Sequence, residues 1–482
     1  MGPQHETSPV EAPPEPAGQR SAFEHRWVPA PALPAAVAVA LGFAAIGLVL
    51  SRPDVVVLAL PFVAISGWAW LHRPRSTRSR VEIMLDESPG MAHGARVLHY
   101  AATFTSSVDP AAETSATETG TETRTGAETR TAAETVHVRY ASQGSVESRA
   151  TLVAGTGPGR PAPRLTGELP VLHSGPHEFL RLDYRLTALD AAFVSEPSAP
   201  VRVQRTVPAP FTPIVSLPLP RRLQGLTGTH DSARPGDGGE FRDVHPFHPG
   251  DRLRRIDWKA TARLSRNPGD LYVRRSAATA DATVFLVLDS GSDVGESVAD
   301  WPGASPTLSG VTSLDLAREA AGSIAAGYVR AGDQVAFHDL TATGRSVPRG
   351  SGARHLQRVL RAIAMTTATG RPFARHRAPI VAQGALVYII SPWLDDETAR
   401  LAALWRGSGH RVIAVDVLPT PRLDRLSREQ RAAHRILWME RNDRMRALTA
   451  TGVDVIRFSD DGDAGARDAR LRVLARPRRQ HA

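Results

Sequence analysis

The sequence contains no cysteine among its 482 residues. This absence excludes disulfides, thiolate metal sites and cysteine nucleophiles, and it leaves the cellular compartment undecided. Lysine is almost absent as well, because Lys259 is the only lysine among 58 basic residues. Arginine in place of lysine, together with abundant Ala, Gly and Pro, is typical of the coding bias of a GC-rich genome. Aromatic residues make up only 6% of the chain, which leaves few side chains for stacking on nucleic-acid bases.

The composition nevertheless supports folded domains. Hydrophobic residues make up 42% of the chain, which is enough to build cores. The length is typical of roughly three domains. The formal net charge of +9 and the isoelectric point near 10.6 are compatible with a nucleic-acid partner or an anionic membrane surface. The basic residues are spread over the whole chain, so the charge alone does not choose between these partners.

Two apolar segments without charge lie near the N-terminus. The first covers residues 27–50 and the second covers residues 55–71, and residues 51–54 link them. A membrane-spanning helix needs roughly 17 to 25 apolar residues, so both segments are long enough. The short link makes the pair a hairpin. We therefore predict a disordered leader over residues 1–26 and two transmembrane helices within residues 27–72.

The flanking arginines orient this hairpin. Six arginines flank its outer ends, whereas the link holds only Arg52, which Asp54 offsets. Such positive flanks stay in the cytoplasm. We therefore predict a multi-pass protein of the cell membrane, held in the lipid bilayer by two spans, with its N- and C-termini in the cytoplasm. A long leader and a second span disfavour a cleaved signal peptide, and a buried helical hairpin of a soluble protein is the other alternative.

Alternating apolar and polar residues predict short strands over residues 81–208, separated by clusters of Pro and Gly. Such strands are typical of a β-sandwich-like domain. A repetitive Glu/Thr/Ala/Gly-rich insert at about residues 111–135 has almost no apolar side chains, so we predict a disordered, solvated loop there. Residues 209–238 are rich in proline, and we predict a stiff, extended connector that acts as a spacer.

The only lysine lies in a distinctive segment at residues 239–280, in which a Pro-Gly-Asp sequence predicts a turn. Basic and acidic side chains are interleaved after this turn, and interleaving favours mutual ion pairs over a phosphate-binding face. We expect Lys259 to occupy a tight, partly buried pocket near Trp258, paired with Asp257 or Asp251, where a guanidinium would not fit. Chance survival of one lysine and a catalytic lysine are the alternatives.

The same segment carries a long motif, in the run RDVHPFHPGDRLRRIDWKATAR. On this motif the chain resembles the bacterial domain-of-unknown-function family number fifty-eight. The matching positions are Arg242, Pro249, Gly250, Asp251, Arg254, Ile256, Trp258, Ala260, Ala262 and Arg263. We predict that the charged, turn and aromatic residues of this motif, with Asp257 and Lys259, form a structural network. Phe247 and His248 stand where the family usually has a tyrosine before Pro-Gly-Asp.

The resemblance covers roughly residue 81 to the C-terminus. It implies a von Willebrand factor A-like α/β module, which in this family is often encoded near a MoxR-type AAA+ ATPase, and it implies no established catalytic activity. The resemblance therefore implies such an ATPase as the partner.

The residues support an α/β module independently. Near-continuous apolar strands alternate with amphipathic helices over residues 281–475, and Thr312 and Asp315 form a capping pair before the first helix. This alternation is typical of a parallel sheet with helices on both faces. The predicted fold is therefore α/β, with a von Willebrand factor A-like parallel sheet preceded by a β-sandwich-like domain and an N-terminal transmembrane helical hairpin.

Ligands of such sheets bind at the carboxyl ends of the strands. The residues that we expect at this edge, together with Ser391, are Asp289, Ser290, Ser292, Asp293 and Asp395. The resemblance implies a cation motif Asp-x-Ser-x-Ser with a distant threonine. Here Gly291 and Asp293 stand at the hydroxyl positions, and the stretch GSGARHL offers no threonine. Asp395 or Asp396 is the candidate for the last carboxylate of the motif. The degraded motif disfavours bound Mg²⁺, so we predict no cofactor. We interpret Asp289 as an aspartate that caps a loop at the sheet edge, with Ser290 and Ser292 as candidates for docking.

The sequence favours a membrane-anchored, non-catalytic adaptor. It would present the α/β module to a partner, by resemblance a MoxR-type ATPase, in assembly or maturation of envelope-associated complexes. The first alternative is a metal-dependent hydrolase that uses Asp289, Asp293 and Asp395, although no Gly-x-Ser-x-Gly, P-loop or His-Glu-x-x-His motif is present. The second alternative is a nucleic-acid-binding protein, which the interleaved charges and scarce aromatics disfavour.

Overall fold

The structure is a computed structural model of the chain. It describes residues 19–74, 76–86, 90–92, 95–108, 133–142, 146–154, 161–221, 223, 228–303, 310–341, 344–369, 378–458 and 464–476. The chain divides into two compact units. The first contains Met1–Val171 and His177–Arg205, and the second contains Leu172–Pro176 and Thr206–Ala482. Each unit is described by itself below.

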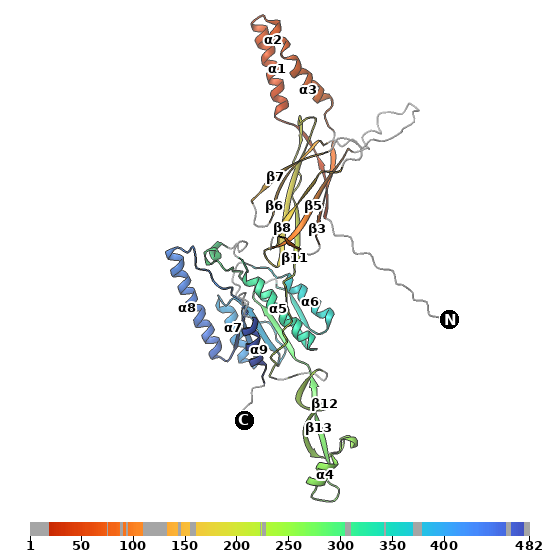
Figure 1. The fold of residues 1–482 in the computed structure, drawn as a ribbon, viewed down its shortest axis with the longest axis vertical. Helices are drawn as coiled ribbons and strands as arrows, with labels where there is room; N and C mark the ends of the chain where they lie inside the picture. Colours follow the sequence, from red (N-terminus) through yellow and green to blue (C-terminus); the bar gives the residue numbers. More distant parts are fainter. Residues whose placement is uncertain are drawn as a thin grey trace, which may run out of the picture. The chain divides into compact units, whose positions relative to one another are not determined.

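Apolar helices form one part of the first unit (Figure 1). They are α1 (Ala32–Val49), α2 (Pro53–Val57) and α3 (Leu60–Leu71). The windows Ala32–Val49 and Pro53–Leu71 have mean hydropathies of 2.3 and 1.8 and are long and apolar enough to cross a membrane. Most of their side chains are exposed, which is the pattern of helices that face lipid rather than a protein core. The prediction of two such helices near the N-terminus is confirmed.

The predicted leader is wrong in part. Residues 19–25 form strand β1 (Gln19–His25), which pairs antiparallel with β3 (Thr77–Leu85). Strand β2 (Trp27–Pro29) follows and pairs with β10 (Phe193–Ser195), so the first helix starts later than residue 27. The buried Trp27 indole donates to Thr77 Oγ1 at 3.0 Å, which ties this segment to the sheet. Residues 1–18 lie outside the described part of the chain.

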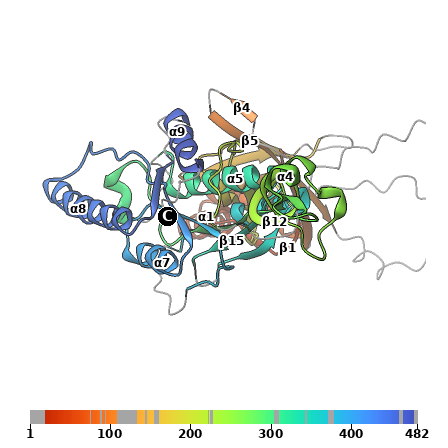
Figure 2. The ribbon, with the colours of Figure 1, turned by 90° about the horizontal axis from the view of Figure 1, so that it is seen from below.

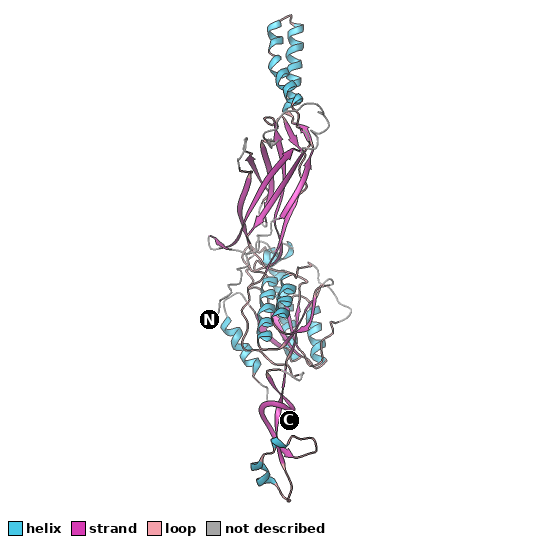
Figure 3. Cartoon of the chain, turned by 90° about the vertical axis from the view of Figure 1, so that its right-hand side faces the viewer, coloured by secondary structure: helices cyan, strands magenta, loops and turns pink. Residues whose placement is uncertain are grey.

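Two antiparallel sheets make up the rest of the first unit (Figure 3). One has the order β1-β3-β5-β4 with β8 on β5, and the other has the order β2-β10-β9-β6-β7 with β11 on β9. The remaining strands are β4 (Gly90–Ala92), β5 (Ala95–Val108), β6 (Thr135–Ser142), β7 (Ser148–Val153), β8 (Arg164–Pro170), β9 (Gly175–Ala188) and β11 (Val201–Val207).

Tyr184 of β9 connects the two sheets of this unit. Its hydroxyl lies 2.6 Å from Ser79 Oγ of β3, and its ring meets Phe104 of β5 edge-on at 5.1 Å. Burial raises the pKa of Tyr184 to about 12, so the hydroxyl stays neutral and can donate. The predicted strands between residues 81 and 208 are confirmed. Most of the predicted disordered insert falls on residues 109–132, outside the described residues.

The proline-rich connector is more than the predicted spacer. Thr212 and Ile214 donate their backbone N–H groups to Ser323 of α5 (Ser313–Arg330), and Ile214 is buried in the core of the second unit. Gly327 of α5 makes this contact possible, because a Cβ there would lie 2.5 Å from the carbonyl oxygen of Ile214. The prolines keep the segment extended, but its apolar side chains still gain by packing on the helix.

A long two-stranded hairpin follows the connector. Strand β12 (His230–Pro246) pairs antiparallel with β13 (Tyr272–Ala280), and the ladder ends at the pair Pro246 and Tyr272. Between them lie the short 3-10 helix η2 (Leu253–Arg255) and helix α4 (Trp258–Leu264), at the end of the two strands in Figure 1. We call the segment from residue 245 to residue 272 the hairpin tip.

The second unit is built on a six-stranded sheet in the order β16-β15-β14-β17-β18-β19. Five strands run parallel, and β16 pairs antiparallel with β15 at one edge. The strands are β14 (Thr283–Leu288), β15 (Gln334–Asp339), β16 (Ser346–Gly350), β17 (Leu386–Ser391), β18 (Arg411–Asp416) and β19 (Asp454–Arg457). Every residue of β17 is buried, as expected for a central strand covered on both faces.

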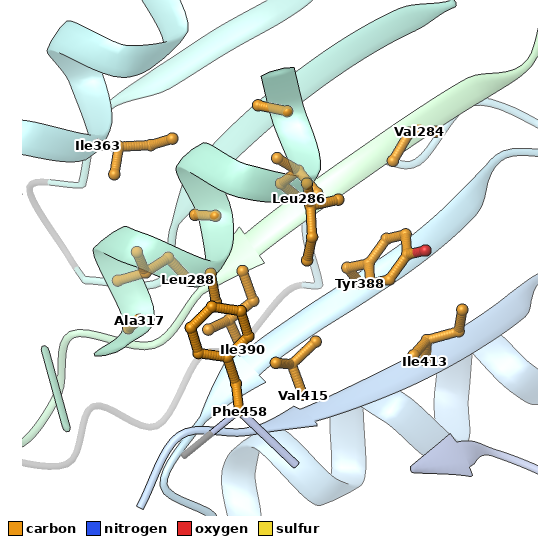
Figure 4. Packing of buried hydrophobic residues seen from close by; sticks show 14 of the residues in the cluster. Val284, Leu286, Leu288, Ala317, Ile363, Tyr388, Ile390, Ile413, Val415 and Phe458 are labelled. Carbon is orange, nitrogen blue, oxygen red and sulfur yellow. The ribbon is translucent and has the colours of Figure 1, made fainter. Parts of the chain in front are cut away.

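Helices cover both faces of this sheet. Helices α5, α6 (Ala353–Ala364) and α9 (Ala464–Ala475) pack on the face that carries Leu286 and Tyr388. Helices α7 (Asp396–Gly407) and α8 (Arg428–Ala450) pack on the face that carries Val287 and Ile389. Figure 2 shows α5 and α9 on one side and α7 on the other, and Figure 4 shows the first cluster. The predicted α/β fold with helices on both faces is confirmed.

Candidate functional site

Several polar residues of the second unit lie at the carboxyl ends of its parallel strands. Asp289 follows β14, Asp339 ends β15, Ser391 ends β17 and Asp416 ends β18. The strand order reverses beside β14, because the chain continues from β14 to β15 on one side and later to β17 on the other. Such a reversal point is where open α/β sheets bind ligands. We call this group the strand-end edge.

Asp289 lies at the centre of the strand-end edge and is 7% exposed. Its Oδ2 accepts a hydrogen bond from Ser391 Oγ at 2.7 Å, and its Oδ1 accepts one from the backbone N–H of Gly291 at 3.0 Å. Burial and the neighbouring charge of Asp395 raise the pKa of Asp289 to about 6, although both hydrogen bonds lower it. The group therefore titrates close to neutral pH.

Asp395 faces the same small pocket as Asp289. The volume of this pocket is about 10 Å³, close to the space that one water molecule needs. Asp395 caps the N-terminus of α7, where its Oδ1 accepts the backbone N–H of Glu397 at 3.0 Å. Asp396 is exposed and pairs instead with Arg444 at 2.6 Å. The carboxylates of Asp289 and Asp395, which line this pocket, already accept hydrogen bonds from nearby backbone N–H groups.

The other residues predicted at the strand-end edge make contacts away from Asp289 and Asp395. Ser290 is fully buried and donates its hydroxyl to Asp339 Oδ1. Asp293 points to the start of α5, where its Oδ1 accepts the backbone N–H of Leu314 at 3.0 Å, and burial raises its pKa. Ser292 is half-buried. The structure therefore brings Asp289, Ser391 and Asp395 together, and it directs Asp293 to a helix N-terminus.

Three strand-end aspartates share one geometry. Each accepts the backbone N–H of the residue two positions later: Asp289 from Gly291, Asp339 from Thr341 at 3.3 Å, and Asp416 from Leu418 at 3.1 Å. These contacts stabilise the turns after the strands. Asp339 and Asp416 were missed by the sequence analysis, although the apolar strand followed by aspartate that identified Asp289 recurs at both positions.

Two further residues of this edge were also missed. Arg441 of α8 is buried, pairs with Asp416 and donates its Nε to the carbonyl oxygen of Pro392 at 3.0 Å. Trp393 is fully buried with a positive φ of 59°, and its N–H groups reach Ser391 Oγ and the carbonyl oxygen of Val415. A left-handed backbone at a buried tryptophan is strained and persists only because these contacts hold it. No local sequence signal marks this conformation.

The hairpin tip holds the motif residues in a turn and a cap. Pro249 and Gly250 (φ 107°) form the predicted turn, and Asp251 closes it by accepting the backbone N–H of His248 at 2.9 Å. Asp257 caps α4 by accepting the backbone N–H of Ala260 at 2.9 Å. Both carboxylates therefore accept hydrogen bonds from backbone N–H groups of the tip itself.

The predicted pocket for the lone lysine is wrong. Lys259 is exposed, and in the described part of the chain it has no ion-pair partner. Trp258 is 68% exposed, so it does not form a wall of a buried site. Arg254 and Arg263 are exposed as well. The segment forms the end of a β-hairpin, and its helix α4 has no buried residue. Among the residues that the structure describes, it does not pack across the sheet, so no buried pocket forms around the lysine.

Two ion pairs described in and next to the tip differ from those expected. Arg242 lies 3.7 Å from Asp243, and His245 lies 3.6 Å from Asp251. Arg274 lies over the ring of Phe241 at 5.1 Å. The structural network predicted for the motif residues stays a prediction.

Fold and edge together define a doubly wound, mostly parallel α/β module that carries a hairpin before its first strand. Residues 243–428 match the family described as protein of unknown function DUF58. This match begins in β12 and ends at the start of α8, so it includes the hairpin tip and most of the sheet. The family resemblance stated from the motif is therefore confirmed over these residues.

The curated relatives are uncharacterized proteins. Mb1516 of Mycobacterium bovis and Rv1480 of Mycobacterium tuberculosis are each 30% identical to this chain over 156 residues. The match covers 31% of this chain and 44% of each relative, so the chain spans less than half of the length of these proteins. No solved structure matches the chain.

Proposed function

We propose that this protein is a membrane-anchored, non-catalytic adaptor that uses the hairpin tip to bind a partner protein, by family resemblance a MoxR-type AAA+ ATPase. The observation that carries the proposal is the exposure of large apolar side chains at the tip, among them Trp258 of the motif. Trp258 and Leu253 are each 68% exposed, and Leu264 is 49% exposed. Exposed large apolar side chains in a group mark interaction sites, and tryptophan is enriched among residues that dominate binding energy.

The charge around this apolar group indicates the chemistry of the partner surface. Arg254, Lys259 and Arg263 are exposed on the same short segment as Trp258. The three carboxylates of the tip, Asp251, Asp257 and Asp270, accept hydrogen bonds from backbone N–H groups. The tip therefore presents exposed basic and exposed apolar side chains on one short segment. Such a surface is complementary to an acidic partner surface with an apolar pocket.

The remaining parts fit an anchored adaptor. Two apolar helices would hold the chain in the bilayer, with both termini in the cytoplasm as the arginine distribution predicts. A cytoplasmic ATPase could then reach the tip. The doubly wound sheet with its antiparallel edge strand is compatible with a von Willebrand factor A-like module, which supports the same assignment.

The hydrolase alternative receives less support from the geometry. A hydrolase needs a cavity that admits substrate beside its reacting groups. The pocket at Asp289 has about 10 Å³, and its carboxylates accept hydrogen bonds from backbone and hydroxyl groups around it. The strand-end edge is therefore better suited to stabilising the turns than to holding a substrate.

The proposal is tested with the full chain in detergent and a purified MoxR-type ATPase of the same organism. Binding is measured by biolayer interferometry for the natural protein and for a Leu253→Ala/Trp258→Ala variant. We expect the double variant to lose at least tenfold in affinity, because truncation of a central interface tryptophan typically costs more than about 1.4 kcal/mol.

A matched control removes an exposed apolar side chain elsewhere. Ile436 of α8 is 60% exposed, and Ile436→Ala should leave the affinity unchanged. Absence of binding by the natural protein would reject the ATPase as partner. Equal affinities of the natural protein and the Leu253→Ala/Trp258→Ala variant would reject the tip as the binding surface.

A further inference from the structure

Three potential metal ligands meet at the hairpin tip. His245 is the residue before the last one of β12 and pairs with Val273, and His248 and Asp251 belong to the turn that follows the strand. Each residue offers one ligand atom, and these atoms lie within 4.8 Å of one another. We propose that His245, His248 and Asp251 bind a divalent transition-metal ion, with Zn²⁺ as the physiological candidate. This site is independent of the proposed adaptor function.

His245 provides the first argument. Its side chain is only 14% exposed, and its Nε2 is buried without a hydrogen-bond partner among the described residues. Asp251 Oδ2 is 3.6 Å away, which is too far for a hydrogen bond. A buried nitrogen without a partner costs free energy. A metal ion between the two atoms would satisfy this nitrogen.

His248 is oriented as metal-binding histidines usually are. Its Nδ1 lies 2.8 Å from the carbonyl oxygen of Pro246, which can only accept, so Nδ1 carries the hydrogen. The Nε2 of the neutral ring then keeps a lone pair. A backbone carbonyl that fixes the tautomer of a ligand histidine is the common outer-shell partner at metal sites. The ring is exposed, so an ion can reach it from solvent.

The turn positions the carboxylate. Asp251 Oδ2 accepts the backbone N–H of His248 at 2.9 Å, and Asp251 donates its own N–H to the carbonyl oxygen of His248 at 3.0 Å. These two bonds fold the Pro249-Gly250 turn so that the carboxylate returns toward both imidazoles. Successive ligands are three positions apart in the sequence. The local turn therefore brings them together without the help of a distant element.

The ligand types select the ion. Imidazole nitrogens favour Zn²⁺ and its late transition-metal neighbours, whereas Mg²⁺ and Ca²⁺ prefer sites made of oxygen atoms. Three protein ligands leave one position of a tetrahedral ion for water or for a group of a bound molecule. The positive charge of Arg275 interacts electrostatically with the carboxylate of Asp251. Its positive charge opposes cation binding, so we expect weaker affinity than at a zinc site made of thiolates.

Another arrangement of the same residues is an ion pair between a protonated His245 and Asp251, with no metal involved. The two arrangements differ in one measurable property, which is saturable uptake of a transition metal that depends on both histidines. His248 decides between them, because it lies in the ligand set but is not needed for an ion pair of His245 and Asp251.

The experiment uses the full chain in detergent, purified with a tag that contains no histidine and treated with a chelator. Zn²⁺ is titrated by calorimetry, and Co²⁺ is titrated while its visible absorption is recorded. We expect one saturable equivalent of Zn²⁺, the intense absorption bands of four-coordinate Co²⁺, and no uptake of Mg²⁺. Because the chain has 17 histidines, the comparison with variants distinguishes this site from weak background binding.

The variants are His245→Gln and His248→Gln, with His137→Gln as the control at an exposed histidine of β6. We expect each of the first two to weaken Zn²⁺ binding at least tenfold and the control to leave it unchanged. Circular dichroism in chelator checks that all variants are folded. The proposal is overturned if the natural protein shows no saturable equivalent, or if His248→Gln binds Zn²⁺ as tightly as the natural protein.

Discussion

At the scale of single residues, Asp289 shows how burial changes a carboxylate. Burial and Asp395 raise its pKa from 3.8 to about 6, so the folded protein holds this proton more tightly than the unfolded chain. The resulting stabilisation is present below about pH 4 and is lost as the pH rises through 6. The difference corresponds to roughly 3 kcal/mol at most.

The first prediction concerns Asp289→Asn. The amide keeps an acceptor for Gly291 or Ser391 and cannot ionise, so the variant should gain stability over the natural protein as the pH rises from 4 to 7. The measurement is hydrogen–deuterium exchange of β14 and β17 at matched pH, because comparison at equal pH cancels the intrinsic exchange rate. Equal protection of both proteins at pH 4 and at pH 7 would show that Asp289 does not titrate in this range.

Asp315 shows the opposite sign. It is largely buried, which raises its pKa, but hydrogen bonds from His173 and Ser174 outweigh this effect and lower the pKa to about 2. Its stabilisation is present above about pH 4 and is lost as the pH falls toward 2.

The second prediction is that Asp315→Asn lowers the free energy of unfolding by about 2 kcal/mol at neutral pH and by less at pH 3. Urea unfolding followed by tryptophan fluorescence measures the difference, and Asp424→Asn at an exposed loop position serves as the control. A loss of the same size at both pH values would show that packing, and not charge, is responsible.

The third prediction separates the two roles at the tip. Asp257→Ala removes the cap of α4 and should destabilise this helix by about 1 kcal/mol. Trp258→Ala should change stability by less than about 0.5 kcal/mol, because the side chain is exposed. Exchange rates of the α4 amides measure both effects. Faster exchange in Trp258→Ala than in Asp257→Ala would place the tryptophan in the structural core of the tip.

At the scale of elements, Gly327 of α5 determines how closely the connector packs on this helix. Alanine normally stabilises a helix by up to about 1 kcal/mol relative to glycine. At Gly327 the added Cβ would lie 2.5 Å from the carbonyl oxygen of Ile214 and 3.1 Å from Leu217. The backbone of the connector cannot give way without breaking its bonds to Ser323.

The fourth prediction is therefore that Gly327→Ala destabilises the second unit by about 1 to 3 kcal/mol, in the range of overpacking. Gly407 ends α7 with open space at its Cβ position, so Gly407→Ala should not destabilise. Thermal unfolding of both variants measures the difference. If Gly327→Ala were as stable as Gly407→Ala, the connector would not be held against α5.

Periodicity predicted most elements because each reflects a repeating pattern of burial. The apolar runs of β14 and β17 and the capping box of α5 were read correctly from local residues. Strand β1 was missed because its partner β3 follows the two apolar helices in the chain, and such pairing leaves no local signal. The short strand β16 was missed as well.

The candidate sites divide in the same way. Asp289 and Ser391 were predicted at one edge because parallel strands end together. The buried pair of Arg441 and Asp416 joins residues far apart in the chain, so the sequence could not show it. The cluster at the tip was missed for another reason. Its histidine and aspartate spacing is local, but the interpretation of the segment was directed to the lone lysine.

At the scale of the whole molecule, the placement of the chain across a membrane is the fifth prediction. The sequence has no cysteine, so each single cysteine introduced becomes the only labelling site. Ser51 lies in the link between the apolar helices, and Ser408 is exposed after α7. The arginines that flank the outer ends of the helices predict that the link faces outward and that the second unit faces the cytoplasm.

In intact cells, a membrane-impermeant maleimide should therefore label Ser51→Cys and not Ser408→Cys, whereas both should react after permeabilisation. The natural protein is the blank, because it offers no thiol. Labelling of Ser408→Cys in intact cells would place the hairpin tip outside, since the tip and Ser408 belong to one unit that follows the helices. A cytoplasmic ATPase could then not be the partner, so this measurement constrains the adaptor proposal without testing the metal site.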